Sequence, residues 1–389
     1  MRVMKNPFTL EIAIGSRLLV NREAELEKVR ETLRGGGKLF VIGPRRFGKT
    51  SILLTAAEEL RAAGDIVLDY NIEGYTGLDL LVRALVSGAA GVSGSLDQAA
   101  KSVRRFFGSL QPTISVDAEG NITASLGLKQ PEPAEQAPML IDALNSLERL
   151  AANAKRRVGV IFDEFQHLLK LGGAGIEGQL RAAVQTHRHV GYVFAGSQTT
   201  LISDMVTNHA RPFYRMGESI FIGAIPREEF LPYLAANFKG IKCKADEEAL
   251  VRLLDLAEDV PYNIQALARA CWDEAAQAKA ATLSSAAVAA THRRLVRGQA
   301  PIYAPSWASL SMNQQKALAA AAGMEGTQLL SRPILKRYDL SPGTMQKALQ
   351  ALETQAILRR DYQDAEVRYR FEDPFFKAWI LTSTVSSHP

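Results

Sequence analysis

One eight-residue segment constrains the possible fold of this chain more than any other. Residues 43–50 read Gly-Pro-Arg-Arg-Phe-Gly-Lys-Thr, which fits the pattern G-x-x-x-x-G-K-T. They lie between an apolar run at Leu39–Ile42 and a helix-like segment at Ser51–Leu60. A strand, this loop and a helix in that order predict a nucleoside triphosphate site. The alternative is a chance glycine turn beside a surface lysine.

Each residue type in this motif has a chemical reason to be there. Gly43 and Gly48 allow a tight turn, so that backbone N–H groups converge on phosphate oxygens beside the positive end of a helix dipole. Lys49 can reach the outer phosphates as a point charge, and the Thr50 hydroxyl can bind Mg²⁺. The expected nucleotide-binding residues are Gly43, Pro44, Arg45, Arg46, Phe47, Gly48, Lys49, Thr50 and Ser51.

Five short apolar runs, suited to buried strands, recur along the first 223 residues. Helical or loop segments separate them with the spacing of β-α-β units. This pattern predicts an α/β fold, in which a five-stranded parallel sheet carries helices on both faces. The expected strands are Leu39–Ile42, Ile66–Asn71, Val158–Phe162, Gly191–Ala195 and Ser219–Ile222.

One segment interrupts this rhythm. Residues 113–116 and 122–126 flank the polar sequence Asp-Ala-Glu-Gly-Asn, which predicts a β-hairpin. A proline-marked linker follows at residues 130–133. We interpret the region at about 110–130 as an insertion between the second and third core strands. It has no assignable chemistry.

Beyond residue 223 the pattern becomes helical. It predicts three domains: a P-loop core at 1–223, a helical lid at 224–298 and a winged helix at 306–389, with a linker at 299–301. In the last domain, three helices and a hairpin follow one another in winged-helix order. The expected helices are Pro226–Phe238, Asp246–Leu256, Pro261–Ala280, Ser284–Arg297, Ser311–Gly323, Leu330–Tyr338 and Pro342–Ile357, and the hairpin pairs Leu358–Tyr362 with Val367–Phe371.

Polar residues follow two of the expected core strands. Asp163 and Glu164 come after Val158–Phe162; Asp163 is expected to hold Mg²⁺, and Glu164 to orient or deprotonate the attacking water. The alternative is that the two acids only cap the next helix. After the following strand, Ser197 is the first candidate and Gln198 the second for a polar sensor of the outer phosphate. A helix N-cap is the alternative role for Ser197.

Several motifs in this order resemble the AAA+ superfamily, specifically the STAND-type archaeal and bacterial ATPases that are related to origin-recognition ATPases. Residues 20–26, Val-Asn-Arg-Glu-Ala-Glu-Leu, are similar to the family's N-terminal signature, and residues 43–50 to its phosphate loop. Residues 163–166 resemble its acidic motif and 194–197 its sensor strand. Residues 211–214 and 369–376 are similar to the segment before its last core strand and to the close of its winged helix.

The resemblance implies Mg²⁺-dependent binding and hydrolysis of ATP, and the preference for ATP over GTP rests on it. It places Val20, Arg22 and Pro261 near the adenine. Two departures concern the lid and the arginine finger. The usual G-x-P before the lid helix reads Asp259-Val260-Pro261, and the usual G-R pair is absent, which leaves Arg211 and Arg215 as candidates for the finger. The catalytic candidates are Lys49, Glu164, Ser197, Arg211 and Arg215, and the metal candidates are Thr50 and Asp163.

Two partners are compatible with the C-terminal domain. Duplex DNA would meet the third helix and the wing, although residues 306–389 carry ten Lys/Arg against eight Asp/Glu, a modest net charge of +2. The other interpretation is a regulatory ATPase whose winged helix makes protein contacts, holds the resting state shut and permits nucleotide-dependent homo-oligomers. The residues expected to touch DNA are Thr344, Gln346, Lys347, Arg359, Arg360, Arg368 and Arg370.

The composition adds weaker constraints. The formal charge of +5 tolerates a nucleic-acid partner without requiring one. The sequence has no run of eighteen apolar residues and no secretion signal at its start, so we expect a cytoplasmic protein without membrane contact. Cys243 and Cys271 lack metal-ligand spacing and are expected to be reduced thiols.

Overall fold

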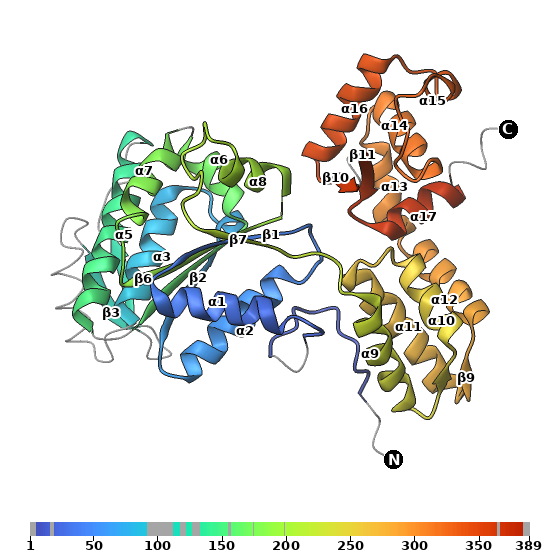
Figure 1. The fold of residues 1–389 in the computed structure, drawn as a ribbon, viewed down its shortest axis with the longest axis horizontal. Coiled ribbons are helices and arrows are strands. Elements are labelled where there is room, and N and C mark those ends of the chain that lie inside the picture. The colour runs from blue at the N-terminus through green and yellow to red at the C-terminus, as the bar shows by residue number, and fades with distance from the viewer. Residues whose placement is uncertain are drawn as a thin grey trace. The chain divides into compact units, whose positions relative to one another are not determined.

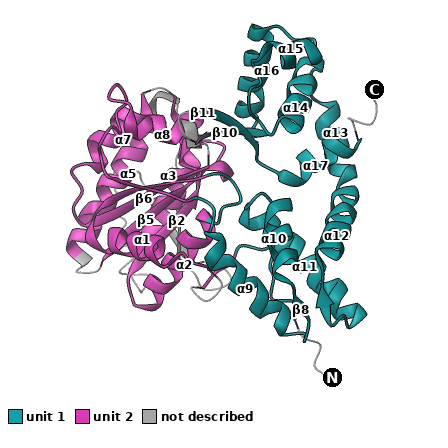
Figure 2. Ribbon diagram, turned by 45° about the vertical axis from the view of Figure 1, so that its right-hand side comes forward, with its two compact units in different colours: residues 1–12, 44–48, 223–389 teal, residues 13–43, 49–222 magenta. Residues whose placement is uncertain are grey.

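The computed structural model describes residues 5–15, 19–91, 112–116, 122–126, 133–154, 157–173, 175–197, 199–363 and 366–383. The chain divides into two compact units, coloured separately in Figure 2. Unit 1 consists of residues 1–12, 44–48 and 223–389, and unit 2 of residues 13–43 and 49–222. The middle of the phosphate loop therefore groups with the C-terminal half of the chain. The lid and winged-helix boundaries stay predictions.

A five-stranded sheet forms the centre of unit 2 (Figure 1). Its order is β2-β5-β6-β1-β7, and every pair of neighbouring strands is parallel. The predicted α/β class and all five predicted strands are confirmed, with ends that differ by at most one residue. The strands are β1 (Lys38–Ile42), β2 (Ile66–Asn71), β5 (Val158–Asp163), β6 (Val190–Gly196) and β7 (Glu218–Phe221).

Helices cover both faces of this sheet. The helices α1 (Glu23–Gly35) and α2 (Lys49–Ala62) pack together on one face, and α3 (Leu78–Gly91), α5 (Pro133–Ala154) and α7 (Ile176–Val184) lie on the other (Figure 1). The second face buries a large hydrophobic cluster, since buried parallel strands need cover on both sides. Short elements complete the unit: η2 (Ile72–Gly74), η4 (Phe165–His167), α6 (Leu168–Gly172) and α8 (Thr199–Thr207).

The predicted hairpin is present as β3 (Pro112–Val116) and β4 (Ile122–Leu126), which pair in antiparallel fashion. Its turn at 117–121 and the linker residues 130–132 lie outside the described residues. The pairing confirms a hairpin between the second and third strands of the parallel sheet.

Unit 1 contains the predicted lid helices followed by the predicted winged-helix elements, with one pair of very short strands. The first group is α9 (Arg227–Lys239), β8 (Lys244–Ala245), α10 (Glu247–Leu256), α11 (Pro261–Ala278), β9 (Thr282–Leu283) and α12 (Ser285–Gly298). The second is α13 (Ala300–Ala308), α14 (Met312–Gly323), α15 (Arg332–Arg337), α16 (Pro342–Thr354), β10 (Leu358–Gln363), β11 (Glu366–Phe371) and α17 (Pro374–Ser383). No described helix is both long and apolar enough to span a membrane.

The linker predicted at 299–301 was wrong, because Ala300 and Pro301 begin the helix α13. Pro301 is compatible with that position since the first turn of a helix leaves its N–H groups unbonded. The helix α17 was also not predicted. In α17 the ring centres of Phe376 and Trp379 lie 5.1 and 6.1 Å from the ring centre of Tyr303 in α13. The aromatic residues of this segment therefore form a local core within unit 1.

Candidate nucleotide site

The metal candidates lie together at the carboxyl end of the sheet in unit 2. Asp163 ends β5, and Thr50 lies in the first turn of α2. The Thr50 hydroxyl donates a hydrogen bond of 2.7 Å to Asp163 Oδ2, and the backbone N–H of Glu164 donates one of 2.9 Å to Oδ1. A hydroxyl and a carboxylate side by side form an oxygen donor set, which suits Mg²⁺ held by one or two protein groups together with phosphates and water.

Burial dominates the electrostatics of Asp163. Its carboxylate is 7% exposed, and this desolvation raises the pKa above the ordinary range, although the Thr50 hydrogen bond opposes the shift. The charge of Glu164 raises the pKa further, whereas Lys49 lowers it. The protein groups around Asp163 therefore offset its negative charge only in part. A carboxylate of this kind is suited to binding a cation.

Glu164 has a left-handed backbone, with a φ of 51°, at the junction of β5 and η4. Its side chain makes no capping hydrogen bond to η4, so Glu164 does not act as a helix cap. Instead Glu164 Oε2 accepts hydrogen bonds from the Ser197 hydroxyl at 2.8 Å and from Gln166 Nε2 at 2.5 Å. The structure thus joins the candidate base to the candidate sensor, which are 33 positions apart in sequence. Gln198 lies outside the described residues.

Gln166 is a component of this site to which sequence reasoning assigned no role. Its side chain is 1% exposed, and its Nε2 lies 2.5 Å from Glu164 and 3.4 Å from the Ser197 hydroxyl. A Cβ at Gly196 would lie 2.5 Å from Gln166 Oε1, so glycine is required there for the amide to fit. The available signal was a polar residue inside the apolar sequence that follows the acidic pair.

The two motif glycines serve different purposes. Gly48 has a φ of 89°, a conformation that side chains disfavour, as expected for the turn into α2. Gly43 lacks such a φ, but a Cβ there would lie 2.4 Å from the carbonyl oxygen of Ile222. Gly43 is therefore needed for the close approach of the chain after β7, which tertiary packing imposes. Lys49 is 5% exposed at the start of α2, and Ser51 follows within its first turn.

Two residues of the phosphate loop, Arg46 and Phe47, contact other residues of unit 1. The Arg46 guanidinium lies 2.8 Å from Asp373 Oδ2 and 5.2 Å from the ring centre of Tyr262, the second residue of α11. The guanidinium of Arg359 in β10 lies 5.2 Å from the ring centre of Phe47. The loop predicted to hold phosphates is therefore in contact with lid and winged-helix residues of unit 1, whereas Lys49 and Thr50 belong to unit 2. Pro44 and Arg45 also belong to unit 1.

The candidate adenine residues are divided between the units. Arg22 is 6% exposed and pairs with Glu25 at 2.9 Å, and Val20 lies two residues before it. Both belong to unit 2, whereas Pro261 begins α11 in unit 1. Their common role at the adenine stays a prediction.

The missing glycine before α11 has a structural explanation. Asp259 stands at the glycine position of the G-x-P motif and has a φ of 55°, the left-handed conformation that favours glycine. Its carboxylate receives two hydrogen bonds, of 2.8 and 2.9 Å, from the guanidinium of Arg227 in α9. This paired geometry offsets the backbone strain, since a bidentate Arg–carboxylate pair is among the stronger polar contacts.

The structure distinguishes the two finger candidates. Arg211 is engaged within its own unit, where its Nη2 lies 2.5 Å from the buried Glu177 and its Nε 3.6 Å from Asp204. Arg215 is exposed, has a φ of 51° and stacks its guanidinium 5.2 Å from the ring centre of Tyr214. It makes no ion pair with any described residue. Arg215 is therefore the better candidate for contact with another molecule.

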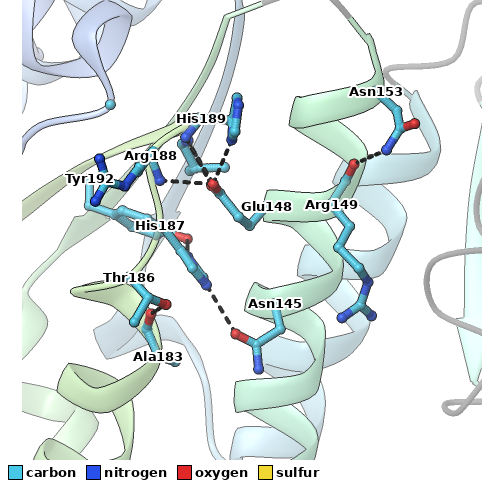
Figure 3. Close-up of polar contacts among 12 residues, drawn as sticks. Asn145, Glu148, Arg149, Asn153, Ala183, Thr186, His187, Arg188, His189 and Tyr192 are labelled. Atoms are coloured by element: carbon cyan, nitrogen blue, oxygen red, sulfur yellow. Dashed lines mark hydrogen bonds and ion pairs between the residues drawn. The ribbon is translucent and has the colours of Figure 1, made fainter.

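A second polar cluster lies at the amino end of β6 (Figure 3). Glu148 of α5 accepts backbone N–H bonds from Arg188, His189 and Val190 at 2.8–3.0 Å, and these bonds lower its pKa although burial acts in the other direction. His187 is buried between Asn145 and the Tyr192 hydroxyl, and burial lowers its pKa. These contacts attach α5 to the amino end of β6. The phosphate loop follows the carboxyl end of the parallel strand β1, so the two sites lie at opposite ends of the strands.

The wing arginines that were expected to meet DNA have carboxylate partners. Each pairs with an acid of its own unit, so the wing does not present four uncompensated positive charges. The pairs are Arg359–Glu372 at 3.7 Å, Arg360–Glu353 at 2.9 Å, Arg368–Glu325 at 3.5 Å and Arg370–Asp361 at 2.6 Å.

The helices α15 and α16 differ from the wing. Arg332, Lys336 and Arg337 on α15 and Lys347 on α16 are exposed, and none of them makes an ion pair with a described residue. Gln346 is exposed beside Lys347, whereas Thr344 is partly buried and its hydroxyl lies 2.8 Å from that of Ser341. We call Arg332, Lys336, Arg337 and Lys347 the basic patch.

Comparison with known proteins agrees with this arrangement. Residues 19–217 match the family model described as an ATPase domain predominantly from Archaea, and residues 301–382 match a winged-helix domain model. The curated proteins contain no match to this chain. The Walker-type ATPase of Pyrococcus abyssi is similar in fold, with 16% identity, a TM-score of 0.58 and coverage of 96% of this chain and 99% of that one.

The Aeropyrum pernix ORC2 protein, in ADPNP–ADP complexes, is similar over 99% of both chains, with 15% identity and a TM-score of 0.55. At such identities these likenesses concern the fold. The family match covers more than half of the chain and includes the phosphate loop, Asp163, Glu164 and Ser197. The chain therefore belongs to the family described as an ATPase domain predominantly from Archaea, and it carries a winged-helix domain after it.

Proposed function

We propose that this protein hydrolyses ATP in a Mg²⁺-dependent reaction and uses it as a conformational switch. The observation that supports the reaction is the pairing of Thr50 with Asp163 at 2.7 Å, next to Glu164 in its network with Ser197. In the proposed reaction Thr50 and Asp163 hold the metal, and Glu164 orients the attacking water.

In this proposal each residue has a separate task. The backbone at Gly43–Gly48 and the Lys49 ammonium bind the phosphates, and Thr50 and Asp163 provide the oxygen ligands for Mg²⁺, which when bound neutralises the developing charge. Glu164 orients the attacking water and accepts its proton. The hydrogen bonds from Ser197 and Gln166 fix the rotamer of Glu164, since a base must lie within hydrogen-bond distance of its water.

Unit 1 responds to the nucleotide state in this proposal. The loop apex at 44–48 contacts α11 through Tyr262 and the winged helix through Asp373 and Arg359, so a change in the loop on nucleotide binding alters contacts made by both. Because the wing arginines are already paired, we favour the interpretation that the winged helix makes protein contacts and holds the resting state shut.

Duplex DNA is the second candidate partner, and the basic patch on α15 and α16 is the observation that favours it. In a winged helix the third helix enters the major groove, and here that helix is α16, with Lys347 exposed near its start. Exposed Lys and Arg side chains without acidic partners can neutralise phosphates, and DNA binding through them would weaken steeply with salt.

Light scattering after size exclusion distinguishes these functions. A Glu164→Gln variant would be run with ATP or ADP, each with and without duplex DNA. Growth with ATP alone supports the protein-contact switch, and growth only with ATP and DNA together supports the DNA-loaded form. The same size in all four conditions would contradict assembly by either route. Lys336→Ala/Arg337→Ala/Lys347→Ala should remove the DNA response, whereas Arg360→Ala, on the paired wing, should retain it.

A further inference from the structure

The carboxylate of Asp373, just before α17, accepts hydrogen bonds from four parts of unit 1. Its Oδ2 lies 2.8 Å from Arg46 Nη1 of the phosphate loop and accepts the Tyr303 hydroxyl at 3.0 Å. Its Oδ1 accepts Asn263 Nδ2 of α11 at 3.0 Å and the Phe375 backbone N–H of α17 at 3.0 Å. One side chain therefore connects the phosphate loop, the lid, α13 and the winged helix.

Arg46 is an unusual residue for its backbone conformation. Its φ is 67°, in the left-handed region, which costs an L-residue about 1–2 kcal/mol and costs glycine nothing. Glycine would therefore satisfy the turn better than arginine. What arginine adds is its side chain, which contacts Asp373 and the ring of Tyr262, while its carbonyl accepts the Tyr262 backbone N–H at 3.3 Å.

The charges of this pair are complementary and partly shielded from water. The Asp373 side chain is 20% exposed and that of Arg46 is 38% exposed. Burial would raise the pKa of Asp373, but the charge and hydrogen bond of Arg46, together with the hydrogen bonds from Asn263 and the Phe375 N–H, lower it overall. The carboxylate is thus ionised at neutral pH. Because Arg46 is partly exposed, the pair is expected to contribute modestly.

We propose that Asp373 is a positioning residue for the phosphate loop: it holds Arg46 and thereby fixes the left-handed turn on which nucleotide binding depends. The inference rests on the proposed ATP site and specifies how the winged helix communicates with it. Docking of α17 raises nucleotide affinity, and any state that withdraws α17 leaves Arg46 in a strained conformation without its partner. Nucleotide affinity then depends on whether α17 is docked.

The alternative role of Asp373 is a helix cap for α17. Asparagine serves as an N-cap as well as aspartate does. Asp373→Asn therefore keeps the bond from Phe375 and removes the charge that holds Arg46. Arg46→Gly is the matched variant on the other side, because glycine keeps the turn without strain and removes the side chain.

Equilibrium binding of a fluorescent ATP analogue tests the proposal in the full chain. We expect Asp373→Asn to weaken affinity about three- to tenfold, the scale of one lost ion pair of this exposure, with kcat at saturating ATP changed less than about twofold. The affinity of Arg46→Gly, which keeps the turn but lacks the side chain, is the reference for the next comparison. In the Arg46→Gly background, Asp373→Asn should have no additional effect, because its partner is already gone.

Two results would overturn the inference: unchanged affinity in Asp373→Asn, or an equal loss of affinity with and without Arg46. The second would mean that Asp373 acts only through the stability of α17. If Asp373→Asn does not fold, Tyr303→Phe removes one donor to the same carboxylate and should show a smaller loss that also disappears in Arg46→Gly. A wild-type protein that binds no ATP would overturn the proposed function as well, whereas normal ATP binding in every variant overturns this inference alone.

Discussion

The Thr50 hydroxyl and the Asp163 carboxylate, 113 positions apart in sequence, are joined by a hydrogen bond of 2.7 Å. Thr50 belongs to the phosphate-loop motif that follows β1, and Asp163 ends β5, which β6 separates from β1 in the sheet. Their contact follows from the parallel order of β1, β6 and β5, in which the carboxyl ends of the strands lie at one edge. It places the metal candidates beside the candidate base, Glu164.

Lys49→Ala should reduce nucleotide affinity by two orders of magnitude or more, since the loop loses the ammonium that is proposed to bind the outer phosphates. Calorimetric titration with ATP, with Mg²⁺ and with EDTA, measures this loss. Tight binding by the variant would mean that the phosphate loop has been wrongly assigned.

Asp163→Asn should separate metal binding from nucleotide binding. The amide oxygen can still accept the Thr50 hydroxyl, but it lacks the charge that attracts Mg²⁺. We expect the affinity for ATP in EDTA to equal that of wild type, and the additional affinity that Mg²⁺ provides to fall about tenfold or more. If Mg²⁺ strengthens ATP binding equally in both proteins, Asp163 is not a metal ligand.

Glu164→Gln should bind ATP with wild-type affinity and hydrolyse it about 10²–10⁴ times more slowly, because the amide cannot accept the proton of the attacking water. Ser197→Ala removes one hydrogen bond that fixes the carboxylate, so its kcat should fall by a smaller factor, about tenfold. Phosphate release under single-turnover conditions measures both. Hydrolysis by Glu164→Gln at the wild-type rate would place the base elsewhere.

Arg211→Ala and Arg215→Ala should have opposite profiles. The first leaves the buried Glu177 without its partner, so we expect a loss of about 2–4 kcal/mol in the free energy of unfolding. The second should leave the unfolding transition unchanged and lower kcat in an assembled protein, by up to about 10³-fold if Arg215 reaches a neighbour's phosphate. Urea titration and steady-state ATPase assays distinguish the two. A destabilised Arg215→Ala with normal kcat would exclude it as a finger.

His292 predicts a pH dependence of stability. Its ring lies 5.0 Å from that of Phe375, and burial, followed by the charges of Arg252 and Arg293, lowers its pKa to about 4 from an ordinary value of 6.5. Because the folded state disfavours the proton, the stabilisation is complete above pH 6.5 and is lost as the pH falls towards 4. Between pH 7 and pH 5 the contribution amounts to about 2 kcal/mol.

In His292→Gln, the free energy of unfolding should therefore fall less between these two pH values than in wild type. Urea unfolding at both pH values gives the two differences. Equal losses in the two proteins would mean that His292 does not titrate with a lowered pKa.

The sequence determined the parts of this protein whose signals are local. The motif at 43–50 requires a strand before it and a helix after it, and the apolar runs predicted all five strands of the parallel sheet. The positions of Asp163 and Glu164 followed because a polar residue after a buried strand lies at the sheet edge. Where the local signal was ambiguous, prediction failed: the linker predicted at 299–301 overlaps the start of α13, because Pro301 is as compatible with a turn as with the first turn of a helix.

Only the tertiary structure decided which distant residues meet. It placed Ser197 against Glu164, engaged Arg211 with Glu177 while leaving Arg215 exposed, and gave Arg46 a partner 327 positions away in Asp373. It also paired the wing arginines with acids, which the net charge of the domain could not reveal. The physical reason is that such contacts depend on strand order and helix packing, and neither is encoded in the spacing of neighbouring residues.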